Sequence, residues 1–193
     1  MDATFYYKEV FTKLGTLGIV WSNGDRSLLI ERIFLPNEVS GENPVTGRIH
    51  TMDWHKVTET SSGQVSKEIF KIEERLQRCI EGKGSEAGLE FFNFTQCSEF
   101  QKAVLLADYR VPPGWITTYG RIADKIGKPG SYRAVGRALA TNPFPLIIPC
   151  HRAVHADGRL GGYGGGIRMK QSLLEREGVR FTENGQVWMN RVC

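Results

Sequence analysis

Three prolines spaced along one short apolar run constrain the fold more than any other feature of the sequence. Pro143, Pro145 and Pro149 lie within residues 142–149, whose other members are mostly apolar. Proline fixes φ, lacks a backbone donor and disfavours helical backbone at the residue before it. The segment therefore cannot be helical. We expect an extended stretch that delivers Cys150-His151-Arg152 to its end.

Cys150 and His151 are the first candidates for chemistry. A thiol beside an imidazole can be an activated nucleophile, because the thiolate rather than the thiol reacts. Adjacent side chains of an extended chain point to opposite sides, so the His151 ring would reach the sulfur only through a bridging water or a local turn. A Cys-His dipeptide alone more often contains an inert buried cysteine. The interpretation therefore depends on the surrounding sequence.

Two features downstream strengthen the case for a site. The glycine-rich run 161–166, with Tyr163 inside it, can approach a ligand closely because it has few side chains, although it could also be a linker. The apolar spacing after it predicts a helix over 167–177. Glu177, at the end of this helix, is either a solvated carboxylate or the group that orients a histidine. In the second case Cys150, His151 and Glu177 form a nucleophile, a base and an orienting acid.

The first half of the chain has the pattern of a small strand-rich domain. Asn-Gly between two β-rich runs is a strong hairpin signal, and apolar residues on one helical face indicate a helix after a polar stretch. The expected elements are strands at 16–21 and 28–34 joined by Asn23-Gly24-Asp25, a loop with an uncertain strand at 41–63, a helix at 66–80, a flexible link at 82–85 and a short strand at 89–94.

The second half is predicted to be mainly helical. Ser98-Glu99-Phe100-Gln101 has the form of a capping box and begins a helix that runs to about Tyr109. Thr118 caps a short helix over 119–126, and Ser131 caps another that runs to Ala140. Two short helices joined by a Gly-containing turn resemble a helix-turn-helix, although two packed helices without a DNA role have the same pattern. We place the domain boundary at 94/95, which gives domains 1–94 and 95–193.

The charge of the chain is unevenly distributed. The 193 residues have a net charge of +4, which excludes nothing by itself. Between residues 125 and 137, however, four cations occur without an acid: Lys125, Lys128, Arg133 and Arg137. Such a stretch suits a phosphate backbone, although a solvated helix face has the same composition.

Other classes of protein find little support. The four cysteines, Cys79, Cys97, Cys150 and Cys193, form no C-x-x-C pair, so we expect free thiols. Cys79 and Cys97 do not show a zinc-ligand pattern with His50 and His55, so we expect no metal, the alternative being a weak site at His50 and His55. No apolar run reaches the roughly 18 residues of a membrane span. Because residues 1–13 do not form a secretory signal, we expect an intracellular protein, cytoplasmic or nuclear.

Taken together, these motifs resemble a known family. Ile148-Pro149-Cys150-His151-Arg152, with Asn142-Pro143 upstream and Gly-Tyr-Gly-Gly-Gly downstream, closely resembles the O6-alkylguanine-DNA alkyltransferases (methylated-DNA–protein-cysteine methyltransferases). The resemblance covers about residues 97–180, with matching spacing from Tyr119 to Glu177. The first half fits the family only in size and in the order of strands and helix. We therefore expect an α+β protein with a small RNase H-like α/β domain followed by a helix-turn-helix domain.

The resemblance implies a role for each residue of the reacting set. Cys150 is the nucleophile, His151 acts as a base through a water, and Glu177 holds His151. Tyr119 donates a proton to the departing base and crowds the phosphate beside the flipped nucleotide. Asn142 braces the helix-turn-helix against the active-site turn.

It also implies how DNA is bound. Arg133 fills the space that the flipped nucleotide leaves in the stack. The second helix lies in the minor groove, where small residues at its surface leave room for the DNA. The residues that match the DNA-binding positions are Ser131, Arg133, Ala134, Gly136 and Tyr119, and those of the base pocket are Tyr163, Gly164 and Ala153. Ala153 stands where the family usually has valine, which puts the packing of the pocket in doubt.

The implied reaction is the stoichiometric transfer of an alkyl group from O6-alkylguanine in duplex DNA to Cys150. It inactivates the protein and requires no cofactor, because the sulfur is the final acceptor. We expect a monomer whose partner is damaged DNA and which binds no membrane. Two alternatives are a non-catalytic lesion binder, whose relatives lack the cysteine, and a cysteine hydrolase using Cys150 and His151, which would turn over.

Overall fold

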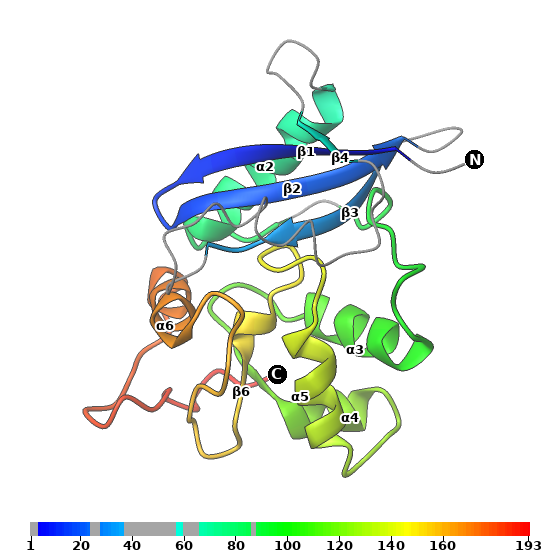
Figure 1. Ribbon diagram of the computed structural model, residues 1–193. Helices are drawn as coiled ribbons and strands as arrows, with labels where there is room; N and C mark the ends of the chain where they lie inside the picture. The colour runs from blue at the N-terminus through cyan, green and yellow to red at the C-terminus, as the bar shows by residue number, and fades with distance from the viewer. Residues whose placement is uncertain (1–3, 24–27, 37–56, 60–65, 86–87) are drawn as a thin grey trace.

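The computed structural model describes residues 4–23, 28–36, 57–59, 66–85 and 88–193. A sheet with one helix against it lies beside a group of further helices, which gives the expected α+β architecture (Figure 1). In chain order the elements are β1 (Phe5–Thr12), β2 (Gly15–Asn23), β3 (Leu28–Phe34), β4 (Val57–Glu59), α2 (Lys67–Ile80), α3 (Glu99–Tyr109), β5 (Thr117–Thr118), α4 (Tyr119–Lys125), α5 (Tyr132–Ala140), the 3-10 turn η2 (Cys150–Arg152), β6 (Ala153–Val154) and α6 (Ile167–Arg176).

The sheet has the strand order β3-β2-β1-β4. The two predicted strands are confirmed as β2 and β3, which pair antiparallel, while Gly24 and Asp25 of the expected turn lie outside the described residues. β1 was not predicted, because Lys8 and Glu9 interrupt its apolar pattern. Lys8 fits this strand because its ammonium pairs with Glu73 of α2 and lies over the ring of Phe70, 4.7 Å from the ring centroid.

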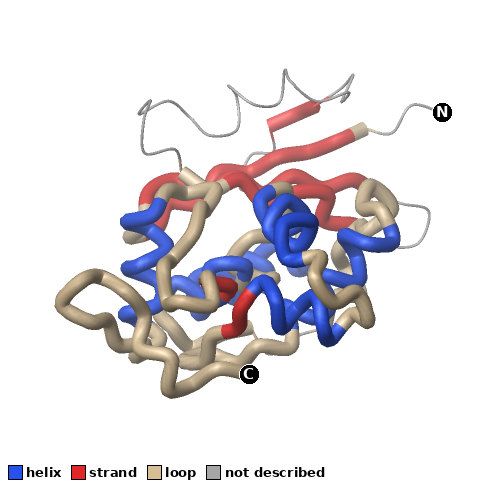
Figure 2. The backbone as a smooth tube through the Cα atoms, turned by 90° about the horizontal axis from the view of Figure 1, so that it is seen from below, coloured by secondary structure: helices blue, strands red, loops and turns tan. Residues whose placement is uncertain are grey.

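Helix α2, predicted at 66–80, packs on one face of the sheet. The tube in Figure 2 shows the strands of the four-stranded sheet along one side of the molecule, while the two-stranded sheet of β5 and β6 lies among the helices and loops of the second half. The core between the sheet and α2 includes Leu17 and Ile19 of β2 and Ile69, Ile72 and Leu76 of α2. The predicted short strand at 89–94 is wrong: a turn at Leu89–Phe92 leaves only an isolated bridge from Phe92 to Ile30.

Side-chain caps begin two of the predicted helices. Ser98 Oγ accepts from Gln101 N at 3.2 Å, and Thr118 Oγ1 accepts from Arg121 N at 3.2 Å. The reciprocal bond of a capping box is not formed, because the Gln101 amide donates instead to Ala138 O and to Thr141 at the end of α5. The predicted cap at Ser131 is wrong. Its ψ of 21° departs from extended backbone, and its side chain makes no cap bond.

The proline-rich segment is a turn rather than the extended stretch that we expected. Leu146 has a φ of +73°, and Ile148 N donates to Phe144 O at 2.9 Å, so the chain reverses. Proline excludes a helix here but does not prevent a turn. The turn joins the two halves, because Pro143 O accepts from Ile33 N of β3 at 2.8 Å and Phe144 is fully buried. One buried cluster extends from the sheet through Phe144 to Cys150.

No helix in the described part of the chain combines the length and the apolar character that crossing a membrane requires.

Candidate active site

Cys150 lies at the start of the 3-10 turn η2, directly after the proline-rich turn. The residue is only 9% exposed, and it forms part of the wall of a cavity of about 610 Å³. This volume is typical of sites for small molecules. The lining residues are Tyr119, Tyr132, Arg133, Gly136, Leu139, Ala140, Cys150, His155, Gly162, Tyr163 and Gly164.

Asn142 ties the proline-rich turn to the sulfur. Its Nδ2 donates to Ile148 O at 3.0 Å and to Cys150 Sγ at 3.2 Å, and its Oδ1 accepts from Phe144 N at 2.9 Å. The Asn142 side chain thus bonds to two backbone groups of the turn, as a donor to one and as an acceptor from the other. A donor placed on the sulfur favours the thiolate, because it stabilises negative charge there.

Behind Cys150, two further residues of η2 converge on one carboxylate. His151 Nε2 lies 2.9 Å from Glu177 Oε1, and the Arg152 guanidinium donates to both oxygens of Glu177 at 2.6–3.0 Å. Arg152 also donates to Val111 O at 2.6 Å. All three side chains are almost completely buried. The 3-10 turn makes this convergence possible, because it places the two residues after Cys150 on the side of α6.

The charges in this cluster follow from burial and pairing. Burial alone would raise the pKa of Glu177, but the bonds and charges of His151 and Arg152 lower it to about 2. Burial lowers the pKa of His151 although Glu177 opposes this. At neutral pH the carboxylate is therefore ionised and the imidazole neutral, with its hydrogen on Nε2 toward Glu177. Nδ1 then has a free lone pair, and it is buried without a partner among the described residues.

Cys150 needs activation in such surroundings. Burial, and next the carboxyl of Asp108, raise the pKa of the Cys150 thiol to about 12, against the Asn142 bond and the charge of Lys170. Because only the thiolate is a strong nucleophile, a base must take the proton during reaction.

Two tyrosines line the cavity from different elements. Tyr119 begins α4, and burial followed by the proximity of Cys150 raises its pKa to about 12, so its hydroxyl keeps its proton at neutral pH. Tyr163 lies in the glycine-rich loop with its ring edge-on to His151, 6.2 Å between centroids. Gly161 holds a φ of +71°, and a Cβ there would lie 2.5 Å from the Tyr119 hydroxyl, so the loop can pass this close only as glycine.

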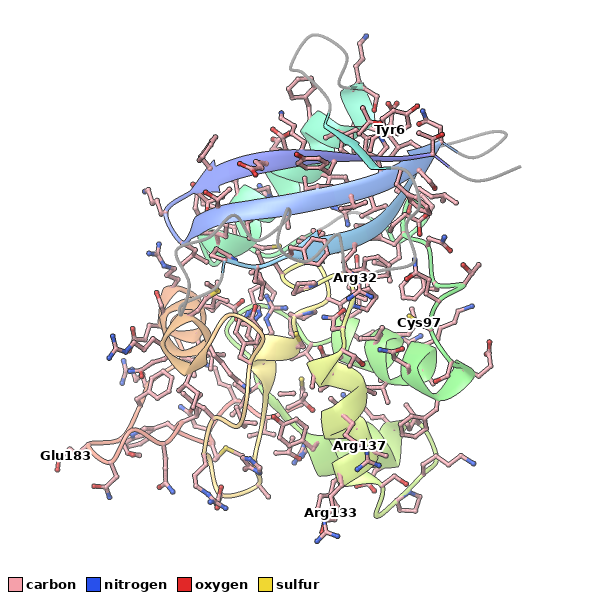
Figure 3. All side chains as sticks on the ribbon, in the orientation of Figure 1. Tyr6, Arg32, Cys97, Arg133, Arg137 and Glu183 are labelled. Carbon is pink, nitrogen blue, oxygen red and sulfur yellow. The ribbon has the colours of Figure 1, made fainter. Side chains whose placement is uncertain are left out.

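Helix α5 forms the opposite wall with Tyr132, Arg133 and Gly136. Figure 3 shows Arg133 at the outer end of this helix, pointing away from the sheet. Its guanidinium lies over the Tyr132 ring, 5.6 Å from the ring centroid. Ala134 and Ser131 lie at the same end of the helix but do not line the cavity.

Ala153, which we expected in the base pocket, is fully buried in β6 and does not line the cavity. Its carbonyl accepts from Lys170 Nζ at 2.7 Å. The other two residues expected in the base pocket, Tyr163 and Gly164, do line it.

Several residues at or behind the cavity were missed from the sequence. The motif contains Arg152 but indicates no role for it, and no pattern in the sequence points to Tyr132 or His155. Lys170 and Asp108 had a signal that could have been used. Each lies four residues from an apolar residue on the buried face of its helix, Leu174 and Val104 respectively, where a charge is unusual.

The described residues contain no group of three or more His, Cys, Asp or Glu side chains that could hold a metal ion, and their four cysteines are free. His50 and His55 lie outside the described residues.

Comparison with known sequences places this site in a family. A family model described as "6-O-methylguanine DNA methyltransferase, DNA binding domain" matches residues 99–179, a span that contains Cys150, His151 and Glu177. The methylated-DNA–protein-cysteine methyltransferase of Methanothermobacter thermautotrophicus is 38% identical over 141 residues, which cover 73% of this chain and 78% of that protein. The protein of the same name from Methanosarcina mazei is 35% identical over 158 residues, 80% of this chain and 87% of its own length.

Solved structures agree with the sequence comparison. The crystal structure of Mycobacterium tuberculosis OGT in complex with DNA has a TM-score of 0.66 and 32% identity, covering 89% of this chain and 92% of that chain. The O6-methylguanine-DNA methyltransferase of Pyrococcus kodakaraensis, at 24% identity and a TM-score of 0.65, shares the fold. On these matches, which run through both halves, the chain belongs to the family of methylated-DNA–protein-cysteine methyltransferases.

Proposed function

We propose that the protein repairs DNA by direct reversal, with Cys150 accepting an alkyl group such as methyl from O6 of guanine in duplex DNA. A bond forms between Sγ and the alkyl carbon while the bond from that carbon to O6 breaks. The electron pair of the broken bond goes to guanine, which ends with the proton that the thiol loses. The observation that carries this proposal is a cysteine in a cavity wall whose sulfur accepts a hydrogen bond from Asn142 and whose next residue, His151, pairs with Glu177.

The acid–base roles follow from the protonation states. With Nε2 donating to Glu177, the free Nδ1 of His151 can take the thiol proton through a bridging water, for which a buried polar atom without a protein partner is a natural site. Glu177 fixes the ring and stabilises its charged form, and Arg152 fixes Glu177. Asn142 holds the sulfur and braces the turn.

Tyr119 is suited to assist the leaving base. Its hydroxyl is protonated at neutral pH and lies in the cavity wall, so it can donate to the guanine that carries developing negative charge. Tyr163 and Gly164 line the same cavity and would contact the base. The thioether that forms on Cys150 is not hydrolysed in this scheme, so each molecule reacts once and needs no cofactor.

The damaged base must leave the base stack before it can reach Cys150, because its reacting atom lies inside the duplex. We assign α4, the turn that follows and α5 as a helix-turn-helix whose second helix enters the minor groove. Arg133, at the exposed end of α5, would fill the gap in the stack. Ala134 and Gly136 would let the groove approach closely, Ser131 and Tyr119 would contact the phosphates, and Lys125, Lys128 and Arg137 would add positive charge.

The remaining assignments belong to the whole chain. We assign residues 1–94 as an RNase H-like α/β domain and 95–193 as the alkyltransferase domain. The antiparallel β1–β2–β3 sheet with a parallel β4 and a following helix is consistent with the first. The partner is double-stranded DNA containing O6-alkylguanine, the acting form is a monomer, and the site of action is the cytoplasm or a nucleus.

Mass spectrometry of the Cys150 peptide tests the proposal. After incubation with duplex DNA containing O6-methylguanine, we expect one added methyl on that peptide and an equal loss of the lesion. Cys150→Ser should bind the DNA and leave the lesion intact. With excess damaged DNA the reaction should stop at one methyl per molecule. An unmodified Cys150 peptide beside bound DNA would exclude transfer, and continued turnover would favour a hydrolase.

A further inference from the structure

Asp108 is a buried carboxyl group that the proposed reaction does not use. It lies on α3, is 0% exposed, and neither of its oxygens has a hydrogen-bond partner among the described residues. Its neighbours on the same face of the helix, Val104 and Leu105, are fully buried and apolar. Burying an ionised carboxylate without a partner is costly, so the charge of this group depends on the charges around it.

Helix α3 packs on η2 and on α4, and it thereby brings Asp108 into the neighbourhood of the reactive cysteine. Titratable groups interact with Asp108 from every side. From η2 these are Arg152 and Cys150, from α6 Lys170, from α4 Lys125 and Tyr119, and from the glycine-rich loop Tyr163.

The buried charges near Cys150 nearly balance one another. Arg152 and Glu177 are bound together by several hydrogen bonds, so their charges cancel locally. His151 is neutral. Lys170 remains as a buried cation, with 0% exposure and a hydrogen bond from Nζ to Ala153 O. A carbonyl does not neutralise an ammonium, so this site has one positive charge to share among the acids near it.

Two acids interact electrostatically with Lys170. The charge of Lys170 is felt both at Asp108 and at Cys150, and Asp108 acts directly on Cys150 with the opposite sign. Two anions next to one buried cation would leave an uncompensated charge in a medium of low dielectric, whereas one anion would not.

We propose that Asp108 and Cys150 share a single negative charge opposite Lys170, so that the cysteine ionises readily only when Asp108 carries a proton. When the thiolate forms beside a protonated Asp108, the S–H bond breaks with its electron pair left on sulfur, and the proton passes through a water to Nδ1 of His151 or on to solvent. The cluster then again has one anion opposite Lys170. Asp108 is thus a positioning residue that acts through Cys150. The inference rests on the proposed function in that Cys150 is the reacting group.

The protonation of Asp108 falls in the range where this competition matters. Burial raises its pKa to about 7, so at neutral pH both of its forms are populated. Burial lowers the pKa of Lys170 to about 8, while Cys150 and Asp108 act in the other direction. The cation is therefore present at neutral pH.

The test measures the ionisation of Cys150 without DNA. The full chain is alkylated with iodoacetamide from about pH 5 to about pH 9, and the rate at the Cys150 peptide is followed by mass spectrometry, separately from the other three cysteines. In Asp108→Asn the thiolate has no competitor, so we expect the pH profile to move to lower pH and the rate near neutral pH to rise about three- to tenfold. Lys170→Met should move the profile the other way.

Two further variants make the result specific. Glu99→Gln removes an exposed carboxylate from the same helix and should leave the Cys150 profile unchanged. Asp108→Leu is neutral without an amide, so it should give the same shift as Asp108→Asn if charge is the cause. An Asp108→Asn profile equal to the wild type, a fall in rate, or an equal shift in Glu99→Gln would overturn the inference. Because no DNA is present, this outcome is independent of whether methyl transfer occurs.

Discussion

Gly161 shows how strongly single residues of the site are determined by their neighbours. A side chain there would need a φ of +71° and would meet the Tyr119 hydroxyl at 2.5 Å and His155 Nε2 at 3.2 Å. We therefore expect Gly161→Ala to lower the free energy of unfolding by about 1–3 kcal/mol. It should also slow methyl transfer, since Tyr119 must move. Urea unfolding and the rate of lesion loss measure the two effects.

The neighbouring glycine gives a matched control for this prediction. A Cβ on Gly162 would meet no atom within 4 Å, and its φ lies outside the left-handed region. Gly162→Ala should therefore leave the free energy of unfolding nearly unchanged. Equal losses in both variants would mean that loop flexibility, and not contact with Tyr119, requires glycine here.

At the residue scale, the sequence predicted the reacting residues better than it predicted the buried residues around them. His151, the residue after Cys150, pairs with Glu177, the pair that the resemblance implied. Asp108 and Lys170 escaped notice because their meaning depends on burial and on each other, and both come from elements distant in sequence. Ala153 does not line the cavity for a different reason: adjacency to the motif does not determine which side of a strand faces a cavity.

Among the elements, α5 has two arginines that separate positioning from charge. Arg133 lines the cavity at the outer end of the helix, whereas Arg137 lies one turn further along, is exposed and does not line it (Figure 3). Each substitution to alanine removes one positive charge. The two variants should therefore lose similar DNA affinity and show a similar decrease in the salt dependence of binding. Only Arg133→Ala should lower the rate of methyl transfer at saturating DNA, by about tenfold or more. In that variant no side chain fills the gap that the flipped base leaves in the stack.

Single-turnover rates at saturating damaged duplex distinguish these effects. The rate of iodoacetamide with Cys150 should stay the same in both arginine variants, since neither touches the sulfur. If Arg137→Ala slows transfer at saturation as much as Arg133→Ala does, the assignment of Arg133 to the vacated stack position is wrong.

Element boundaries followed from local signals where those signals were strong. The caps at Ser98 and Thr118 and the apolar face of α2 gave helices close to their observed bounds. The shape of the proline-rich segment did not follow, because proline restricts its own φ and the residue before it but cannot reveal that Leu146 adopts a φ of +73°. β1 was missed because a pairing between Lys8 and Glu73 of another element permits a charge within a half-buried strand.

At the scale of the whole molecule, the proline-rich turn connects the two halves that we propose to divide at 94/95. Phe144 is fully buried, its ring is edge-on to Phe92 and Phe94 at 5.0 and 5.2 Å, and the backbone beside it accepts a bond from β3. The same turn holds Asn142 against Cys150. The sheet therefore supports the reactive cysteine through this turn, although its own residues are distant in sequence.

A shared core of this kind predicts that the two halves unfold together. Phe144→Ala should lower the free energy of unfolding by about 3–5 kcal/mol, because it empties a fully buried aromatic site. Pulsed thiol labelling across a urea gradient measures both halves at once, since Cys79 is buried in α2 and Cys150 in the second half. We expect coincident midpoints for the two peptides in the wild type and an equal shift of both in the variant.

Phe11→Ala, at a side chain that is 82% exposed, is the control and should shift neither midpoint. If the Cys150 midpoint falls while that of Cys79 stays, the halves unfold separately and the turn supports the site from one side only.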